Sequence, residues 1–219
     1  MEIFQVIVGV VAFALLSVGA FAELPKGTSI RRRHSSDLIR SAVTWTLPII
    51  EGGPDFTFNG TVEEVFTKIN LARLEKGYPA LDDPSGLSFD TDNGLSTRTD
   101  DELLRSRNLS KIICDAGLSG PGFAIRIEQG AKYLQGVKGM CGLGPGPGNC
   151  GRISCSYGSA IYWCNDNNHF VQYNCSAFAA YANNIVDQCS YVDQMNNLYC
   201  WGQAFDDQNF NVMVGMDSC

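Results

Sequence analysis

The chain has 219 residues, of which 45% are hydrophobic, and this is enough to bury the core of one ordinary domain with extensions. Its formal net charge of −7 at pH 7 argues against nucleic acid as a main partner, because contact with phosphates requires a basic surface. The acidic balance does not by itself identify a partner.

The first residues indicate the compartment. Residues 3–20 form an apolar run that ends in Ala20-Phe21-Ala22, the small-x-small pattern that signal peptidase accepts. We therefore predict a signal peptide over residues 1–22 and a secreted, extracellular protein, since the run is short and interrupted for a membrane span. The basic run Arg31-Arg-Arg33 fits two interpretations equally: a kexin-type cut that removes residues 23–33 as a propeptide, or an ordinary solvated charge run.

Residues 34–108 are predicted to form an N-terminal extension with one helix and a flexible linker. Thr61-Val-Glu-Glu64 is a capping box, and apolar residues follow it at roughly helical spacing, which predicts a helix over residues 61–76. Residues 82–101 are polar, contain Pro84 and two glycines, and lack periodicity, which is typical of a linker. The cysteine-rich domain is expected to span residues 109–219.

The cysteine-rich domain begins with a predicted strand over residues 111–114 and a predicted helix over residues 123–137. Gly130 inside that helix costs about 1 kcal/mol relative to alanine, so packing must hold the helix together. Residues 139–151 are mostly glycine and proline, with Cys141 and Cys150 among them, and predict a loop.

Residues 150–166 are expected to form the central hairpin of the sheet. Strand-forming residues flank Gly158, and glycine reaches the positive φ that a two-residue turn requires. Alternation then places Ile153 and Cys155 on one face together with Cys164, and Trp163 on the other face. We therefore expect Cys155 and Cys164 each to be bridged to a different covering element.

A second helix is predicted after Asn174, and its apolar stripe carries a cysteine at each end, Cys175 and Cys189. Residues 198–205 and 209–214 predict a second hairpin. The expected fold is α+β in the order β-α-β-β-α-β-β, with a mainly antiparallel sheet and two helices on one of its faces.

All nine cysteines lie between residues 114 and 219, which in a secreted protein indicates disulfides rather than metal ligands. Their spacings repeat no metal-binding knuckle, and we expect neither a metal nor a cofactor. The odd number leaves one thiol free, capped or paired between chains, so the protein is expected to be a monomer or a dimer through that cysteine. Asn59, Asn108 and Asn174 begin Asn-x-Ser/Thr triplets and are candidate glycosylation sites.

Several motifs over residues 114–219 together resemble small cysteine-rich secreted proteins of filamentous fungi. These motifs are Cys114-Asp, Tyr133-Leu-Gln-Gly-Val137, Cys150-x-Arg-Ile-Ser-Cys155, Ser159-Ala-Ile-Tyr-Trp-Cys164-Asn-Asp166, Cys189 and Asn211-Val-Met-Val214 with Cys219. The arrangement is similar, more loosely, to the killer toxins encoded by viruses of smut fungi and to extracellular necrosis-inducing effectors.

The resemblance implies a killer-toxin-like sandwich and a secreted effector or toxin-like protein that acts on another organism. It implies six disulfide positions, with two of Cys141, Cys175 and Cys200 forming an additional pair. The six positions are Cys114, Cys150, Cys155, Cys164, Cys189 and Cys219. The chain departs from the basic killer toxins in being acidic, which argues against a lysine-dependent block of a channel.

The residues are compatible with three functional classes. A non-catalytic effector or toxin-like interaction protein is the main expectation, with an unknown extracellular protein, membrane or wall glycan as its target. A wall-glycan-binding protein is the alternative, with Tyr162, Trp163 and Trp201 as the ligand face unless Trp163 is buried beneath a helix. A ribonuclease-like hydrolase comes third, because it would need its base, acid and phosphate clamp from Glu128, His169 and Arg152.

Overall fold

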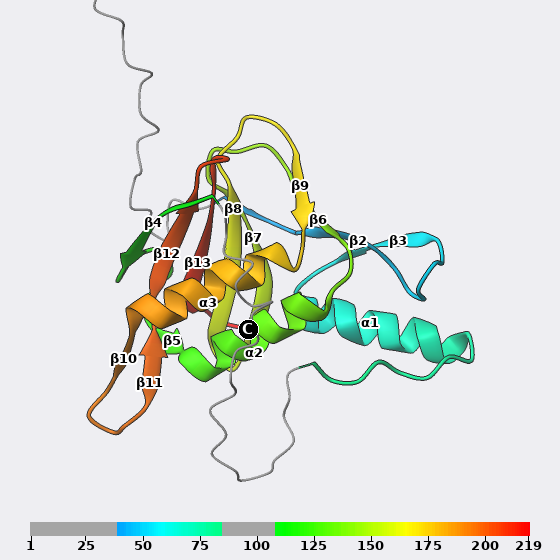
Figure 1. The fold of residues 1–219 in the computed structure, drawn as a ribbon, viewed down its shortest axis with the longest axis horizontal. Helices are drawn as coiled ribbons and strands as arrows, with labels where there is room; N and C mark the ends of the chain where they lie inside the picture. The colour runs from blue at the N-terminus through cyan, green and yellow to red at the C-terminus, as the bar shows by residue number, and fades with distance from the viewer. Residues whose placement is uncertain (1–38, 85–107) are drawn as a thin grey trace, which may run out of the picture.

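The computed structural model describes residues 39–84 and 108–219. The predicted signal peptide, the basic run and most of the expected linker lie outside these residues. The described chain is an α+β fold with three helices and mostly antiparallel sheets (Figure 1). This confirms the expected fold class at the level of secondary structure and sheet type.

The largest sheet has six strands in the order β1-β7-β8-β13-β12-β4. Every neighbouring pair in it is antiparallel except β1 and β7. Its strands are β1 (Ile39–Ser41), β7 (Asn149–Ser156), β8 (Ser159–Asn165), β13 (Phe210–Met216), β12 (Gly202–Asp206) and β4 (Leu109–Cys114).

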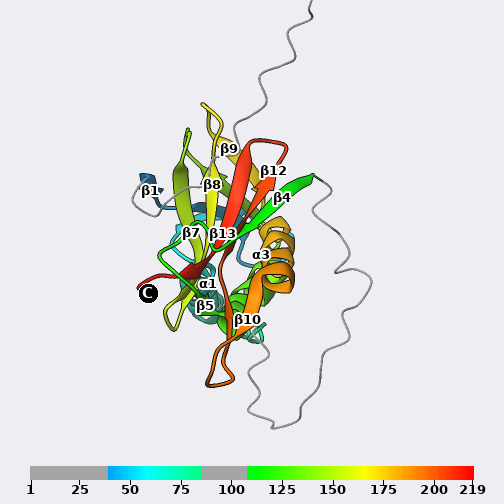
Figure 2. The same cartoon turned by 90° about the vertical axis from the view of Figure 1, so that its left-hand side faces the viewer.

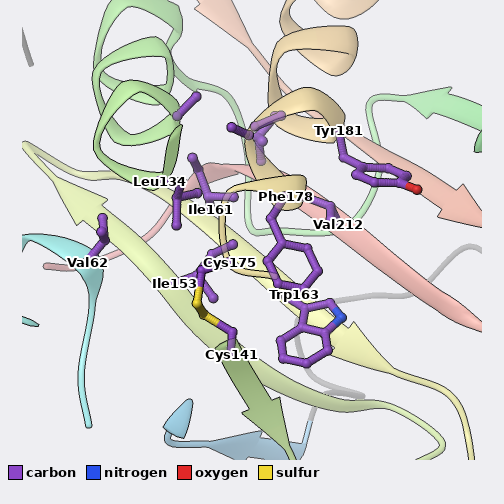
Figure 3. Close-up of a cluster of buried hydrophobic side chains, with 14 of the residues drawn as sticks. Val62, Leu134, Cys141, Ile153, Ile161, Trp163, Cys175, Phe178, Tyr181 and Val212 are labelled. Carbon is purple, nitrogen blue, oxygen red and sulfur yellow. A yellow bond between two sulfur atoms is a disulfide. The ribbon is translucent and has the colours of Figure 1, made fainter. Parts of the chain in front are cut away.

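Helices α2 (Ala124–Gly136) and α3 (Ala177–Cys189) cover one face of this sheet, as expected from their apolar stripes (Figures 1 and 2). α2 packs on β7 and β8, and α3 packs on β12, β13 and β4. The side chains of Ile161, Trp163 and Phe178 are fully buried between the layers (Figure 3). Burial of this kind of apolar surface is the main driving force for the fold.

Gly130 explains how α2 approaches the sheet so closely. A Cβ atom at Gly130 would overlap the hydroxyl of Ser154 on β7 and would lie 3.2 Å from Cδ1 of Ile161 on β8. The helix therefore tolerates the low helix propensity of glycine because a side chain would push α2 away from β7 and β8.

The central hairpin turns at Tyr157 and Gly158, which both have positive φ, as in a type I′ turn. The expected alternation along β7 is wrong, because a bulge shifts the register between Arg152 and Ser154. Ile153 consequently joins the helix-covered core, while Cys155 lies with Cys164 on the opposite face of the sheet.

The disulfides differ from the expected pattern at the hairpin. Cys164 pairs with Cys150 across the hairpin itself rather than with another element, because the two residues are direct neighbours in register. Cys155 is bridged to another element, the segment after β13, through Cys219.

α3 is held at both ends by disulfides from the cysteines that flank its apolar stripe. Cys175 pairs with Cys141 at the start of the helix, and Cys189 pairs with Cys114 at its end. Cys200 is the remaining thiol. Several disulfides are typical of extracellular proteins.

A second sheet has the order β3-β2-β6-β9. Its strands are β2 (Thr44–Pro48), β3 (Asp55–Asn59), β6 (Met140–Leu143) and β9 (Val171–Asn174). β6 lies within residues 139–151, which we expected to be a loop. The glycines there serve close packing, since a Cβ at Gly142 would overlap the ring of Phe170 and one at Gly139 would lie 2.7 Å from the carbonyl oxygen of Thr46.

Residues 39–84 contribute apolar side chains to the core of the cysteine-rich part. Val43, Trp45, Val65 and Ile69 belong to the same buried cluster as Trp163. α1 (Val62–Glu75) begins with the predicted capping box, in which the Thr61 backbone N–H donates to the Glu64 carboxylate at 3.1 Å. Its other first-turn acid, Glu63, accepts hydrogen bonds from the Ser154 hydroxyl and from the Cys155 backbone N–H.

A third, small sheet contains β10 (Ser190–Val192), β11 (Leu198–Cys200) and β5 (Gly122–Phe123) in the order β10-β11-β5. The expected strand over residues 198–205 is therefore two strands in different sheets. The break falls at Trp201, whose ring nitrogen donates to the Leu118 carbonyl oxygen at 3.1 Å.

Candidate functional site

The hairpin of β10 and β11 follows α3 directly and projects away from the rest of the fold (Figures 1 and 2). Together with Phe123 on β5, residues 190–200 form a surface that we call the aromatic hairpin. The segment 190–200 contains a single charged residue, Asp193. Its exposed side chains are otherwise apolar, aromatic or amide.

Three aromatic rings form a ladder across the small sheet. Tyr191 is paired in register with Tyr199, and Tyr199 is paired with Phe123. The Phe123 and Tyr199 ring centroids are 4.8 Å apart and those of Tyr191 and Tyr199 are 6.2 Å apart, both in stacked orientations. Directly opposed aromatic pairs of this kind stabilise a short sheet and hold the rings in place.

The tip of the hairpin is a rigid turn that displays Met195. One carboxylate oxygen of Asp193 accepts the backbone N–H groups of Met195 at 2.9 Å and Asn197 at 2.8 Å, and Asn196 has a φ of 65°. These hydrogen bonds lower the pKa of Asp193 below its ordinary value, and the bond from the Asn197 backbone N–H has the largest effect. Met195 is 79% exposed and Val192 is 57% exposed, so the tip presents apolar side chains to solvent.

The base of the hairpin carries the unpaired cysteine. Cys200 is fully buried, and burial raises the pKa of its thiol to about 12. A thiolate is the reactive form of cysteine, so Cys200 is unreactive in this fold. A dimer linked through Cys200 would require β11 to open.

The expected glycan-binding face of Tyr162, Trp163 and Trp201 is not formed. Trp163 is buried against Phe178 of α3, with 4.5 Å between ring centroids, because its strand position faces the helices (Figure 3). Tyr162 lies on the opposite face of the sheet and is also buried. Trp201 is half-buried and bound to the Leu118 carbonyl oxygen, so the three rings share no exposed surface.

The three residues considered for ribonuclease chemistry are held in separate surroundings. His169 is exposed in the loop after β8, where its ring contacts the Asn168 side chain at 3.2 Å. Arg152 on β7 is paired with Asp217 on the sheet face opposite α2 and α3, while Glu128 lies on α2. The structure thus brings no base, acid and phosphate clamp together from these residues.

The candidate glycosylation sites differ in accessibility. The side chains of Asn59, at the end of β3, and Asn174, at the end of β9, are exposed, whereas Asn108 is half-buried beside β4. The Asn174 side chain also accepts hydrogen bonds from the backbone N–H and hydroxyl of Ser176, at 3.3 and 3.0 Å, before α3. Glycosylation at these three positions stays a prediction.

The sequence interpretation assigned no structure to residues 190–197 and missed the aromatic hairpin. A signal was present, because Tyr191 and Tyr199 stand eight residues apart around Asp193-Gln-Met-Asn-Asn197, a turn-forming segment. The register that stacks the rings, however, depends on β5, which lies far away in the sequence.

No protein-family model, curated protein or solved structure matched the chain. No helix in residues 39–84 and 108–219 is long and apolar enough to cross a membrane. The fold and the site therefore define a class of protein: an α+β protein that is cross-linked by disulfides and has a projecting apolar hairpin.

Proposed function

We propose that the protein is a secreted, non-catalytic interaction protein of the effector or toxin-like type, which binds an extracellular target protein through its aromatic hairpin. The observation that carries the proposal is the preorganised apolar tip with Met195 above the ladder of Tyr191, Tyr199 and Phe123. Aromatic residues and Met are enriched at protein–protein interfaces, and charged residues are depleted at their centres. Exposed apolar patches on a soluble fold commonly mark such interfaces.

A protein target fits the hairpin better than a glycan. Sugars stack on broad exposed ring faces, but the central ring, Tyr199, is flanked by Phe123 and Tyr191, whose ring centroids are 4.8 and 6.2 Å away. A protein target also fits better than a lipid bilayer. Asp193 at the tip is held in its charged form, and inserting a charge into hydrocarbon is costly.

The proposal is tested by the binding of the purified, disulfide-intact protein to intact fungal and plant cells. The Val192→Ser/Met195→Ser variant removes the apolar tip. Leu71→Ser/Leu74→Ser, which removes two exposed apolar side chains from α1, is the matched control. We expect saturable binding that is abolished by protease treatment of the cell surface. The tip variant should bind at least about tenfold more weakly, and the control should bind as the unmodified protein does.

Two results would contradict the proposal. In the first, the tip variant binds cells as the unmodified protein does. In the second, binding survives protease treatment and is reproduced on lipid vesicles or on insoluble wall glycans, which would make a membrane or a glycan the target.

A further inference from the structure

A cleft of about 270 Å³ lies on the face of the six-stranded sheet opposite α2 and α3, and its lining includes no residue of the aromatic hairpin. We call it the arginine cleft. It is bounded by β1 and the residues after it, by β7 and β8, and by the beginning of α1. The residues that bear on its chemistry are Arg40, Ser41, Thr61, Glu64, Arg152 and Tyr162.

Three donors of the arginine cleft converge on one carboxylate oxygen of the chain itself. The Tyr162 hydroxyl donates to Oδ2 of Asp217 at 2.6 Å. The Nη1 atoms of Arg152 and Arg40 lie 3.4 and 3.6 Å from the same oxygen. Burial, followed by the hydrogen bond to Asp217, raises the Tyr162 pKa to about 12, so the phenol remains a donor into the alkaline range.

Two arginines and two acids meet at the arginine cleft, so its formal charges balance only while Asp217 is in place. Two guanidinium groups face the single carboxylate of Asp217, and Arg152 also donates to the carbonyl oxygen of Ser218 at 2.6 Å. The other acid of the cleft, Glu64, receives the Thr61 backbone N–H at the start of α1. Without Asp217 the cleft would carry a net positive charge, because Arg40 and Arg152 would face Glu64 alone, and paired arginines are well suited to hold a planar carboxylate.

The Asp217 side chain contacts the two arginines, whereas its backbone is held by separate hydrogen bonds. The Asp217 N–H donates to the Gly158 carbonyl oxygen at 3.2 Å, and the Met216 N–H donates to that of Gly120 at 2.7 Å. The disulfide between Cys155 and Cys219 holds the following residues. A rotation of the Asp217 side chain would therefore move the carboxylate away from the arginines while these backbone contacts stay in place.

We propose that the arginine cleft binds a small hydroxylated carboxylate, of the sugar-acid class, and that Asp217 occupies the carboxylate position in competition with this ligand. Asp217 defines where an anionic group sits, between Arg40, Arg152 and the Tyr162 hydroxyl. The side chains of Ser41, Thr61 and Glu64 supply hydroxyl and carboxylate partners for neighbouring ligand hydroxyls. The volume of about 270 Å³ lies just below the usual range for ligand pockets, which suits a ligand no larger than a single sugar ring.

The proposal is tested by NMR titration of the full, disulfide-intact protein with glucuronate, and with glucose, acetate and sulfate as comparison ligands. We expect glucuronate to saturate and to shift the Tyr162 resonances, while the three comparison ligands bind at least about tenfold more weakly. Asp217→Asn removes the competing charge without changing the side-chain shape, so it should tighten glucuronate binding about tenfold. Arg152→Gln should weaken it by at least the same factor.

The matched control is Arg126→Gln on α2, where the guanidinium lies over the Tyr157 ring at 4.0 Å, outside the cleft. It should bind glucuronate as the unmodified protein does. The proposal is overturned if neither the unmodified protein nor Asp217→Asn binds glucuronate at millimolar concentrations, or if Arg152→Gln retains binding. Equal binding of sulfate or acetate would overturn the assignment to hydroxylated carboxylates. A thermal melt of each variant verifies that it is folded.

Discussion

The two faces of the six-stranded sheet are stabilised in different ways. On one face, α2 and α3 bury a continuous apolar layer that includes Ile161, Trp163 and Phe178. Among the described residues, the other face is covered by neither α2 nor α3 and has a smaller buried cluster around Cys150, Tyr162 and Met213. Two disulfides, Cys150–Cys164 and Cys155–Cys219, and the polar contacts of Asp217 supplement it.

The difference shows where this fold can accommodate a site. A helix-covered face is close-packed and leaves no room for a ligand. A face without helices buries less apolar surface, and covalent links reduce its dependence on packing. Polar groups can then remain partly accessible there, as Arg40 and Arg152 do.

The largest expected effect is on the helix-covered face. Trp163→Ala removes a fully buried ring between β8 and α3 and should lower the free energy of unfolding by about 3–5 kcal/mol. Urea denaturation with intact disulfides measures this loss. Trp201→Ala, at a half-buried ring outside that layer, should cost clearly less. An equal loss of stability in the two variants would mean that the layer around Trp163 contributes no more to stability than the surroundings of Trp201.

The face opposite α2 and α3 should depend most on its covalent link to the chain end. Cys155→Ser/Cys219→Ser opens a link between residues 64 positions apart and should cost about 2–4 kcal/mol. If the double variant denatures at the same urea concentration as the unmodified protein, the link contributes little.

A smaller effect tests how closely α2 approaches the sheet. Gly130→Ala should lower the free energy of unfolding by about 1–3 kcal/mol, although alanine favours helices, because its Cβ would overlap Ser154. Gly136→Ala in the last turn of the same helix meets only Pro84, at 3.5 Å, and should be neutral or stabilising by up to about 1 kcal/mol. Stabilisation by both substitutions would show that α2 can move away from β7 freely.

The smallest effect concerns pH and the polar contacts of Tyr162. Its pKa is raised in the folded protein from 10.0 to about 12, so the folded state keeps a proton that the unfolded state loses. The contribution of Tyr162 to stability is therefore complete below the unfolded pKa and is lost as pH rises toward the folded value.

Tyr162→Phe should cost about 1 kcal/mol at neutral pH and reduce the loss of stability in alkali. Thermal melts between neutral and alkaline pH measure both effects. Tyr157→Phe, at a ring that is 73% exposed, is the control and should leave the neutral melting temperature unchanged. An unchanged alkaline slope in Tyr162→Phe would contradict the role assigned to this hydrogen bond.

Local sequence patterns determined the helices and the central turn. The capping box at Thr61 and Glu64 places its own hydrogen-bonding groups at the start of α1. Cys189 and the apolar residues Phe178, Ile185 and Val186 lie on the buried side of α3, because helical periodicity fixes which residues share a face. Gly158 accepts the positive φ of the turn, which depends only on the residue itself.

Tertiary structure decided the features that depend on residues distant in the sequence. The bulge at Ile153 reverses the alternation along β7, and the strand identity of β6 follows from its pairing with β2 and β9. The Cys150–Cys164 pair follows from register rather than from spacing. The ladder of Tyr191, Tyr199 and Phe123 and the arginine cleft each join segments separated by dozens of residues. No local pattern encodes such convergence, because it arises only when the strands pair and the layers pack.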